Sequence, residues 1–301
     1  MNAGPRAVTA GAGHRPPLLE PVTVVYVAFG VTGVDVSWLD PDDPVIVVHN
    51  DDLLPTGTLD RRGVTDVVSA GNVGFGAAVN SALELVRTPR VVLCNPDVRL
   101  TREHRRLLAC TEPDEVVALA LDDERGEPTW TVLPYPGALA AVVMGHRIGR
   151  ALGRRSRLRD LGSRLLTGGR ARYASLLGTT SGSWPLRTHW VSAALLSIDA
   201  ARLREVGGFD AGYFLYMEDV DLSRRLAARF PSMRVRLPGG EPAVHIVGGS
   251  AGARPARSVE LDRIRSVRRY CSLQTGIRWR AASAALGPRS WWLAGRAGAA
   301  R

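Results

Sequence analysis

Short apolar runs alternate with a helical pattern over the first hundred residues of this chain. Runs rich in β-branched residues at 22–28, 44–50, 64–70 and 90–95 have the length of strands and are largely apolar. Strands that are buried on both faces of a parallel sheet show this pattern. Residues 71–87 instead carry apolar side chains at helical spacing. The alternation predicts an α/β fold with a nucleotide-binding, Rossmann-like sheet that is flanked by helices.

The later part of the chain predicts further strands and an acidic helix. The run at 189–199, HWVSAALLSID, has the composition of one strand. Residues 217–230 begin with acids and continue with leucines at helical spacing, which is typical of a helix whose acidic start suits its dipole. A short strand is expected at 233–238, ahead of His245.

Two basic segments stand apart from the predicted catalytic domain, which we place at 21–250. Residues 146–178 mix leucines with arginines and predict a basic helical insertion, and residues 251–301 predict a basic helical appendage. Residues 1–20 have no apolar core of signal-peptide type and predict a disordered tail. No run of about 18 apolar residues occurs, so no spanning helix is expected, and the protein is expected in the cytoplasm.

The net charge narrows the choice of partner. The net charge is +10, and the chain has 39 arginines and no lysine. An anionic partner follows: a nucleotide diphosphate, a phospholipid surface or nucleic acid. The three cysteines, Cys94, Cys110 and Cys271, are odd in number and form no CxxC motif. They predict free thiols in a reducing compartment, not a disulfide framework or a zinc site.

Polar side chains follow two of the predicted strands. Asn50 and Asp51 come after the second strand, and Asp97 comes after the fourth. Ligands of open α/β sheets bind in the crevice at the carboxyl ends of the strands. We therefore expect these three side chains near one crevice.

Four segments carry a resemblance to a known family: GNVGFGAAVN at 71–80, NPDV at 95–98, WVSAALLSI at 190–198, and GGFDAGYFLYMEDVDLSRRL at 207–226. In this order and spacing the chain resembles the family 2 glycosyltransferases of the GT-A fold. It is most similar to bacterial rhamnosyltransferase-like members that build cell-wall or surface polysaccharides. The resemblance implies an inverting enzyme that moves a sugar from a nucleotide diphosphate to a glycan or a lipid-linked acceptor.

The resemblance also implies a metal site. Asp97 matches the last residue of the family's Asp-x-Asp-like element, with Asn95 beside it, and would hold a divalent cation that bridges the donor diphosphate. Mg²⁺ or Mn²⁺ is expected, since hard cations take carboxylate and phosphate oxygens. His245 would complete the site, because imidazole suits Mn²⁺. The alternatives are a plain turn at residues 95–97 and a structural role for His245.

Asp219 matches the catalytic base of the family. It would take a proton from the acceptor hydroxyl during the attack on the anomeric carbon. Glu218 is assigned to the catalytic pair, and with Asp221 it would raise the pKa of Asp219 as a like charge. Asp221 and Arg224 are also spaced as an i,i+3 pair on the helix surface. The alternative for Asp219 is a solvated acid at the start of a helix.

The donor would lie against two loops. Asn50 and Asp51 match positions near the nucleoside, but His49 stands where relatives have an Asp that contacts the base. Either His49 or Asp51 could make that contact. Asn72 and Gly74 match the family's Asn-x-Gly-Phe element, which lies under the donor, where glycine permits close backbone approach.

Three further positions complete the expected site. Ala193 stands where relatives usually have glycine near the donor sugar, so its methyl group would narrow the pocket. Trp190 would line the acceptor cleft, with a core tryptophan as the alternative. Asn80 would order a loop from within its helix.

The donor is expected to be dTDP-rhamnose first, with UDP- and GDP-sugars open, and the acceptor a glycan or a polyprenyl-linked sugar. The arginine-rich segments favour peripheral binding to the anionic inner face of the cell membrane, against the alternative of a solvated basic surface. A nucleic-acid-binding protein is the rival from another class, but the site acids would repel phosphate in the absence of a metal. A catalytically inactive GT-A scaffold is the other alternative.

Overall fold

The computed structural model describes residues 20–31, 33–51, 63–109, 112–146, 179–246 and 255–298. The predicted disordered tail and basic insertion lie almost entirely outside these residues. Cys110 also lies outside them, while Cys94 and Cys271 are buried free thiols.

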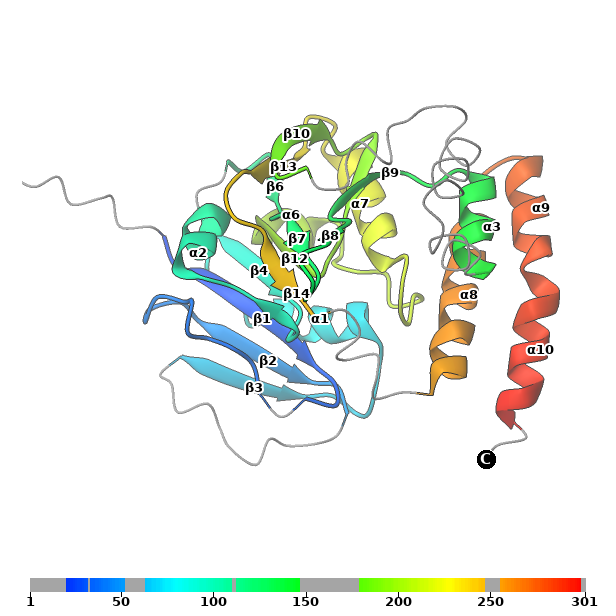
Figure 1. Cartoon of the computed structure of the whole chain (residues 1–301), viewed down its shortest axis with the longest axis horizontal. Coiled ribbons are helices and arrows are strands. Elements are labelled where there is room, and N and C mark those ends of the chain that lie inside the picture. Colours follow the sequence, from blue (N-terminus) through cyan, green and yellow to red (C-terminus); the bar gives the residue numbers. More distant parts are fainter. Residues whose placement is uncertain are drawn as a thin grey trace, which may run out of the picture.

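A large mixed sheet forms the centre of the molecule (Figure 1). Its strand order is β10-β13-β6-β12-β4-β1-β2-β3. Strand β1 pairs in parallel with β2 and β4, and β2 with β3, whereas β12 runs antiparallel to both β4 and β6. The strands are β1 Val22–Ala28, β2 Val45–His49, β3 Val64–Val68, β4 Arg90–Cys94, β6 Glu115–Val117, β10 Ser181–Pro185, β12 Leu195–Asp199 and β13 Arg234–Pro238.

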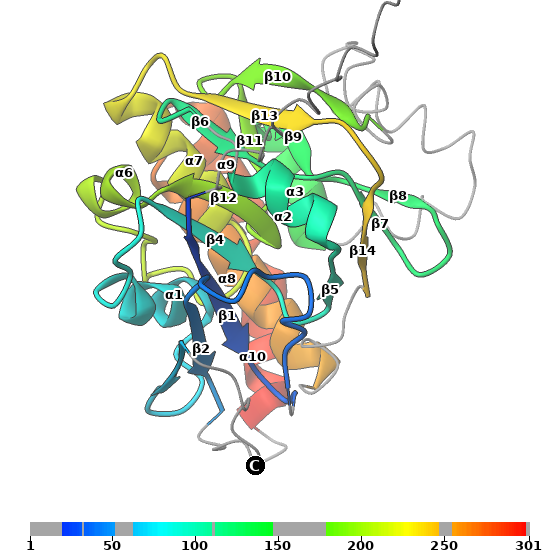
Figure 2. The ribbon, with the colours of Figure 1, turned by 90° about the vertical axis from the view of Figure 1, so that its left-hand side faces the viewer.

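The apolar runs at 22–28, 44–50 and 90–95 become central strands because both faces of the sheet are covered there, whereas the run at 64–70 forms the edge strand β3, which has no buried residue. Every residue of β1, β2 and β4 is buried. Helices α1, α6 and α7 lie on one side of the sheet and α2 lies on the other (Figure 2). One core forms beneath α1, α6 and α7, and a second core includes Leu108 of α2 and Trp38. The helices are α1 Phe75–Leu83, α2 Arg102–Ala109, α3 Ala138–His146, α6 Ala200–Glu205, α7 Glu218–Arg229, α8 Ala256–Ser272, α9 Ile277–Ala285 and α10 Gly287–Gly298.

The strand expected at 189–199 is wrong as a single element. Residues His189–Val191 form β11, which pairs with β9 (Val132–Pro134), while β12 belongs to the main sheet. Between them the amide of Ser192 donates to the carbonyl of Thr131, and the amide of Ala194 donates to the Ser192 hydroxyl. The segment changes partners there, and composition alone does not report a change of partner.

A small sheet brings distant segments to the end of β4. Its order is β5-β14-β7-β8, formed by Val98–Arg99, Ala243–His245, Leu121–Asp122 and Pro128–Thr129. The ladder aligns His245 with Val98, so the residue after Asp97 is the direct partner of His245. The expected convergence of these two positions thus depends on a short antiparallel pairing.

Helices α3, α8, α9 and α10 form a layer along one side of the molecule (Figure 1). They share a third core with Tyr213, Met217 and Val220, which lie just before and within the start of α7. The expected mixed α/β sheet, with flanking helices and a C-terminal helical tail, is therefore confirmed. Among the described helices, none combines the length and the apolar character needed to cross a bilayer.

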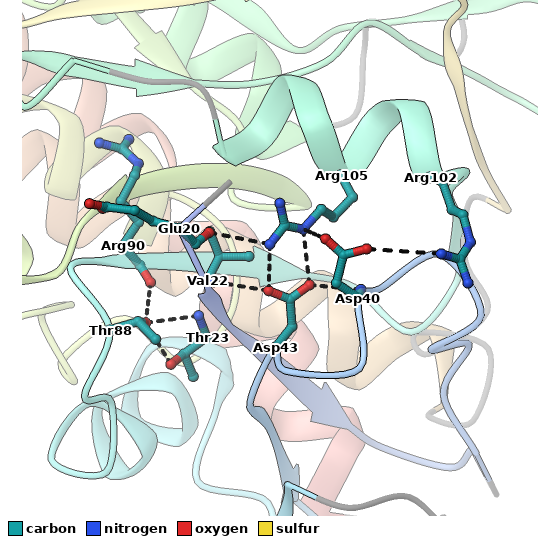
Figure 3. Close-up of polar contacts among 9 residues, drawn as sticks. All are labelled: Glu20, Val22, Thr23, Asp40, Asp43, Thr88, Arg90, Arg102 and Arg105. Carbon is teal, nitrogen blue, oxygen red and sulfur yellow. Dashed lines mark hydrogen bonds and ion pairs between the residues drawn. The ribbon is translucent and has the colours of Figure 1, made fainter. Parts of the chain in front are cut away.

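A buried ion pair ties α2 to the loop before β2 (Figure 3). The Arg105 guanidinium meets the Asp43 carboxylate at 2.8 Å through Nη2 and at 3.0 Å through Nε. Asp43 also accepts the amide of Val22 at 3.0 Å, and Asp40 contacts Arg105 at 3.2 Å. Both Arg105 and Asp43 side chains are almost fully enclosed. The first residue of β1 is therefore fixed by a charge network.

We expect Asp43→Asn to lower the free energy of unfolding by about 3 kcal/mol, because the buried Arg105 charge loses its main partner. Urea unfolding followed by circular dichroism measures the change. The matched control is Glu103→Gln, which removes an exposed ion pair with Arg106 and should cost less than about 1 kcal/mol. Equal stability of Asp43→Asn and wild type would contradict a structural role for the pair.

Candidate active site

Asp97 and His245 meet at the carboxyl end of β4. The His245 Nε2 lies 3.3 Å from the Asp97 Oδ1, and both side chains are mostly buried. The amide of Ile246 donates to the Asp97 carbonyl at 2.8 Å, which fixes the two backbones. The Asp97 Oδ1 is buried and has no hydrogen-bond partner. The Asp97 oxygen therefore has unused hydrogen-bonding capacity and faces the imidazole nitrogen of His245.

A divalent cation fits this pair of groups. Oxygen with one nitrogen is a donor set that suits Mn²⁺, and Mg²⁺ also accepts few protein ligands when phosphate oxygens and water supply the rest. Within the described residues no cluster of three or more His, Cys, Asp or Glu side chains could hold a metal. An ion at Asp97 and His245 would therefore take its other ligands from a substrate or from water.

The segment before β12 connects the end of β4 to the start of α7. The amide of Asn95 donates to the carbonyl of Ala194 at 2.8 Å. The carboxylate of Asp219 has backbone hydrogen bonds with Ala193 and Val220, the second at 2.8 Å through Oδ1. Ala193 itself is buried in the core beside α1 and α7. The adjacent residues Ala194 and Ala193 thus hold the loop that follows β4 and the predicted base Asp219, respectively.

Two consecutive residues adopt left-handed backbone conformations directly before α7. Tyr216 has φ 69° and Met217 has φ 68°, although neither is a glycine. Such conformations are costly for side-chain-bearing residues and concentrate at functional sites. Met217 is buried in the third core, so packing against the helical layer compensates for the strain. This sharp turn sets the direction of the first turn of α7 and therefore of the Glu218 and Asp219 side chains.

The two carboxyls at the start of α7 are both shifted toward the protonated form. Burial, and then the neighbouring charge of Asp219, raises the pKa of Glu218 to about 8. Burial also raises the pKa of Asp219 to about 6, while the backbone hydrogen bonds from Val220 and Ala193 act in the opposite direction. Glu218 Oε2 is buried without a hydrogen-bond partner. Near neutral pH the pair therefore carries one negative charge, held on Asp219.

The expected surface pair of Asp221 with Arg224 is wrong. Asp221 instead binds Arg225 at 2.6 Å, one residue further along α7. Arg225 also donates to the carbonyls of Val206 and Gly208, so this pair anchors the loop before the turn. Arg224 points to α8 and contacts Tyr270 and Gln274. Arg224 and Arg225 are both spaced to reach Asp221 on the helix surface. Arg225 is the partner because it also binds the carbonyls of Val206 and Gly208.

Asn50 and Asn72 form a polar junction at the end of β2. The Asn50 amide donates to Asn72 Oδ1 at 3.1 Å, and Asn50 Oδ1 accepts the amide of Val73 at 3.0 Å. Ser69 also donates to Asn50 and to the His49 carbonyl. Ser69 was not singled out from the sequence, but its place just after β3 is the same strand-end signal that identified Asn50. These residues bind each other and hold the loop before α1.

His49 and Asp51 differ in how much they leave open for a base. The His49 Nε2 lies 2.7 Å from the Asp66 Oδ1 of the neighbouring strand, and the ring is buried. Asp66 therefore occupies the Nε2 of His49, and a contact of the His49 ring with a pyrimidine stays a prediction. Asp51 is half-buried and accepts the amide of Gly30 at 2.6 Å. Its place at the end of β2 keeps it a candidate for donor binding.

Gly74 and Gly76 are required by packing within the protein. A Cβ at Gly74, where φ is 91°, would lie 2.5 Å from the carbonyl oxygen of Phe214. A Cβ at Gly76 would lie 2.7 Å from the Phe209 side chain. Asn80 exchanges two 2.8 Å hydrogen bonds with the backbone of Phe209, so the expectation that it orders a loop is confirmed. The glycines let α1 approach the 207–214 loop closely.

Trp190 lies on β11 and packs partly against the third core. Its indole nitrogen donates to the carbonyl of Pro134 at 3.2 Å, and its ring is half-buried. The neighbouring Val191 amide donates to the Ser223 hydroxyl of α7. Trp190 is therefore held next to the helix that carries Asp219, and its role toward an acceptor stays a prediction.

We expect Gly74→Ala to lower the free energy of unfolding by about 2 kcal/mol or more, because the new methyl group meets a backbone oxygen at a strained φ. Chemical unfolding measures it. Gly33→Ala is the control: no atom lies within 4 Å of its Cβ position, and its change should stay within about 0.5 kcal/mol. A Gly74→Ala protein as stable as the control would show that the loop yields freely.

Stability should depend on pH through the two carboxyls. Their folded pKa values lie above the ordinary 4.5 and 3.8, so the folded state binds more protons and loses stability as pH rises from about 4 to 8. Glu218→Gln removes much of this dependence. We expect its melting temperature to gain on wild type as pH rises from 5 to 9. A constant difference across that range would contradict the raised pKa of Glu218.

No family model matches this chain. Over 67 residues it is 40% identical to the N-acetylglucosaminyl-diphospho-decaprenol L-rhamnosyltransferase of Mycobacterium tuberculosis, in strains CDC 1551 / Oshkosh and ATCC 25618 / H37Rv. The match covers 22% of this chain and 21% of the relative. The chain thus spans about a fifth of the length of the curated relatives it matches.

Solved glycosyltransferase structures superpose on the chain with TM-scores below 0.5. Mannosyltransferase PcManGT from Pyrobaculum calidifontis, in complex with GDP-Man and Mn²⁺, gives 0.48 at 13% identity over 94% of this chain and 76% of that chain. TarS 1-349 of S. aureus gives 0.46 at 10% identity over 88% and 70%. GalNAc-T7 with UDP, GalNAc and Mn²⁺ gives 0.48 at 11% identity over 87% and 52%.

The four ordered motifs, the mixed sheet and the 67-residue match agree with one another. The chain is similar to the family 2 glycosyltransferases of the GT-A fold.

Proposed function

We propose that this protein is an inverting glycosyltransferase that moves a sugar from a nucleotide-diphosphate donor to an acceptor hydroxyl. The observation that carries the proposal is the meeting of Asp97 with His245 at the end of β4, with Asp219 bonded to Ala193 next to the same loop. Three segments that are far apart in the chain supply a candidate cation site and a candidate base.

The donor diphosphate would lie at Asp97 and His245. A cation bound by these side chains would offset the charge of the departing nucleoside diphosphate. The unused Asp97 Oδ1 and the facing imidazole nitrogen support this assignment. We assign Asn95, Ala193, Asn50, Asp51, Asn72 and Gly74 to the walls of the donor site.

Asp219 is the proposed base. The acceptor oxygen would form a bond with the anomeric carbon while the bond to the diphosphate breaks, and the hydroxyl proton would pass to Asp219. Backbone hydrogen bonds with Val220, with Ala193 and within Asp219 itself favour the Asp219 anion, whereas Oε2 of Glu218 is buried without a hydrogen-bond partner. Glu218 would therefore keep a proton and leave the charge on its neighbour, as in other carboxyl pairs with separated pKa values.

The donor and acceptor follow from the rhamnosyltransferase similarity. We propose dTDP-rhamnose as the first donor to test, and a glycan or polyprenyl-linked sugar as the acceptor. The relative's name pairs L-rhamnosyl transfer with a decaprenol-linked sugar diphosphate. An acceptor of that kind would place the reaction in cell-wall or surface polysaccharide synthesis at the cytoplasmic face of the membrane, with Trp190 beside the acceptor.

Nucleotide binding should require a cation and Asp97. We expect one of dTDP, UDP or GDP to raise the melting temperature with Mn²⁺ or Mg²⁺ and not with EDTA, because only the folded protein binds. Asp97→Asn should abolish that rise. Glu124→Gln, an exposed acid in the β7–β8 turn, is the control and should keep it. The absence of any metal-dependent shift with all three nucleotides would refute the donor site.

Transfer should require Asp219 without affecting donor binding. We expect Asp219→Asn to lower transfer by about 10²–10⁴-fold, since a positioned base contributes that much, while the nucleotide-induced shift persists. Wild-type turnover should fall below pH about 6 as Asp219 takes up a proton. Measured transfer from dTDP-rhamnose to a polyprenyl-linked sugar tests both. Nucleotide binding with no turnover by wild type, for any donor, would favour an inactive scaffold.

A further inference from the structure

The last two helices present one face to the protein and another to solvent. Helices α9 and α10 follow each other at the outer edge of the helical layer and pack on α3 and α8 (Figure 1). Their inward residues recur at helical spacing and are buried: Ala282, Leu286, Ser290 and Leu293. This stripe accounts for the folding of the tail, so the opposite face is not needed for the core.

The opposite face carries an exposed apolar stripe with the same periodicity. Its residues occur at intervals of three or four along both helices: Ile277, Ala281, Ala284, Pro288, Trp291 and Trp292. Ile277 is 82% exposed, Trp291 81% and Trp292 55%. A stripe with two tryptophans at one end is unusual for a surface that faces only water.

The charge around this face has one sign. From Arg263 to Arg301 the chain has nine arginines and no Asp or Glu. Arg278 and Arg280 are exposed on α9. The acids of α8 are Glu260, which pairs with Arg263 and Arg289, and Asp262, which also has an interaction partner. Arg263, Arg269 and Arg289 are ion-paired, and the remaining arginines leave this region with an excess of positive charge beside the apolar stripe.

A polar cavity opens beside the stripe, between the end of α8 and α9. Its volume is about 520 Å³, and Arg268, Arg280, Ser283 and Ala284 are among its lining residues. Arg268 donates to the Ser290 hydroxyl at 2.9 Å through Nη1, while its Nε is buried without a hydrogen bond. Two guanidinium groups therefore line a cavity that shares Ala284 with the stripe.

We propose that the α9–α10 face docks on an anionic phospholipid bilayer, with a lipid headgroup phosphate entering the cavity lined by Arg268 and Arg280. Tryptophan at the water–lipid boundary and arginine on anionic headgroups are the contacts such a surface makes. A second copy of the chain would set like charges against each other across the interface. The biological role of this surface rests on the proposed function, since a polyprenyl-linked acceptor lies in the bilayer. The observations that support the surface do not depend on that function.

Flotation of the full-length protein with vesicles tests the surface. Wild type should bind phosphatidylcholine vesicles that contain phosphatidylglycerol, and bind pure phosphatidylcholine vesicles weakly. The double variant Trp291→Ala, Trp292→Ala should reduce binding about tenfold or more, because two boundary anchors are lost. Trp130→Ala removes a 50% exposed tryptophan outside these helices and should leave binding unchanged.

A second pair of variants tests the cavity. Arg280→Gln should weaken binding to the anionic vesicles about fivefold, in line with the loss of one arginine near a charged surface, and high salt should weaken wild type in the same direction. Arg106→Gln, an exposed arginine on α2, is the control and should bind as wild type does.

Several results would overturn the proposal. Equal binding to neutral and anionic vesicles would do so, and so would unchanged binding of the double tryptophan variant. Stabilisation by inorganic phosphate without vesicle binding would also do so. The last such result is a protein that does not bind vesicles but forms a concentration-dependent dimer, or a DNA complex, that the double tryptophan variant cannot form. The nucleotide-induced rise in melting temperature separates the two proposals. The double tryptophan variant should keep it, whereas Asp97→Asn should lose it and still float with vesicles.

Discussion

The antiparallel pairing of β12 with β4 is the constraint on which the candidate site depends. It aligns Leu195 with Cys94, so the residues before β12 lie beside the loop that follows β4. The carbonyl of Ala194 then receives the amide of Asn95, and Ala193 bonds to the Asp219 carboxylate. A register shift of one residue would invert the side chains of β12 and separate these contacts. The proposed cation site and base therefore share one backbone connection.

Charge at the start of α7 is controlled by two opposed effects. Burial makes ionisation of Glu218 and Asp219 costly, and their proximity prevents both from being charged together near neutral pH. Backbone hydrogen bonds then favour the anion on Asp219. The turn at Tyr216 and Met217 holds this arrangement through a strained backbone, which is sustained by the burial of Met217. Strain, burial and charge are thus concentrated within four consecutive residues.

The helical layer is continuous with this region. Tyr213, Met217 and Val220 lie in the same core as residues of α8, α9 and α10, so the proposed membrane-facing helices share a core with the start of the helix that carries the proposed base. The layer gives the strained turn its apolar support on one side and presents an arginine-rich, tryptophan-bearing face on the other. A lipid-linked acceptor would then approach the site from the side of this helical layer, which also supports the turn before α7.

The sequence by itself determined the buried strands, the acidic helix and the identity of most candidate residues, because periodicity, strand-end polar residues and the run at 207–226 are local signals. It did not determine that 189–199 divides between two sheets, that Asp66 engages His49, or that Asp221 selects Arg225. It also gave no signal of the left-handed turn before α7. Each of these outcomes depends on a partner that is distant in the chain or chosen among equally spaced candidates. Only the tertiary structure brings those partners together, since hydrogen-bond and charge energies depend on distance in space.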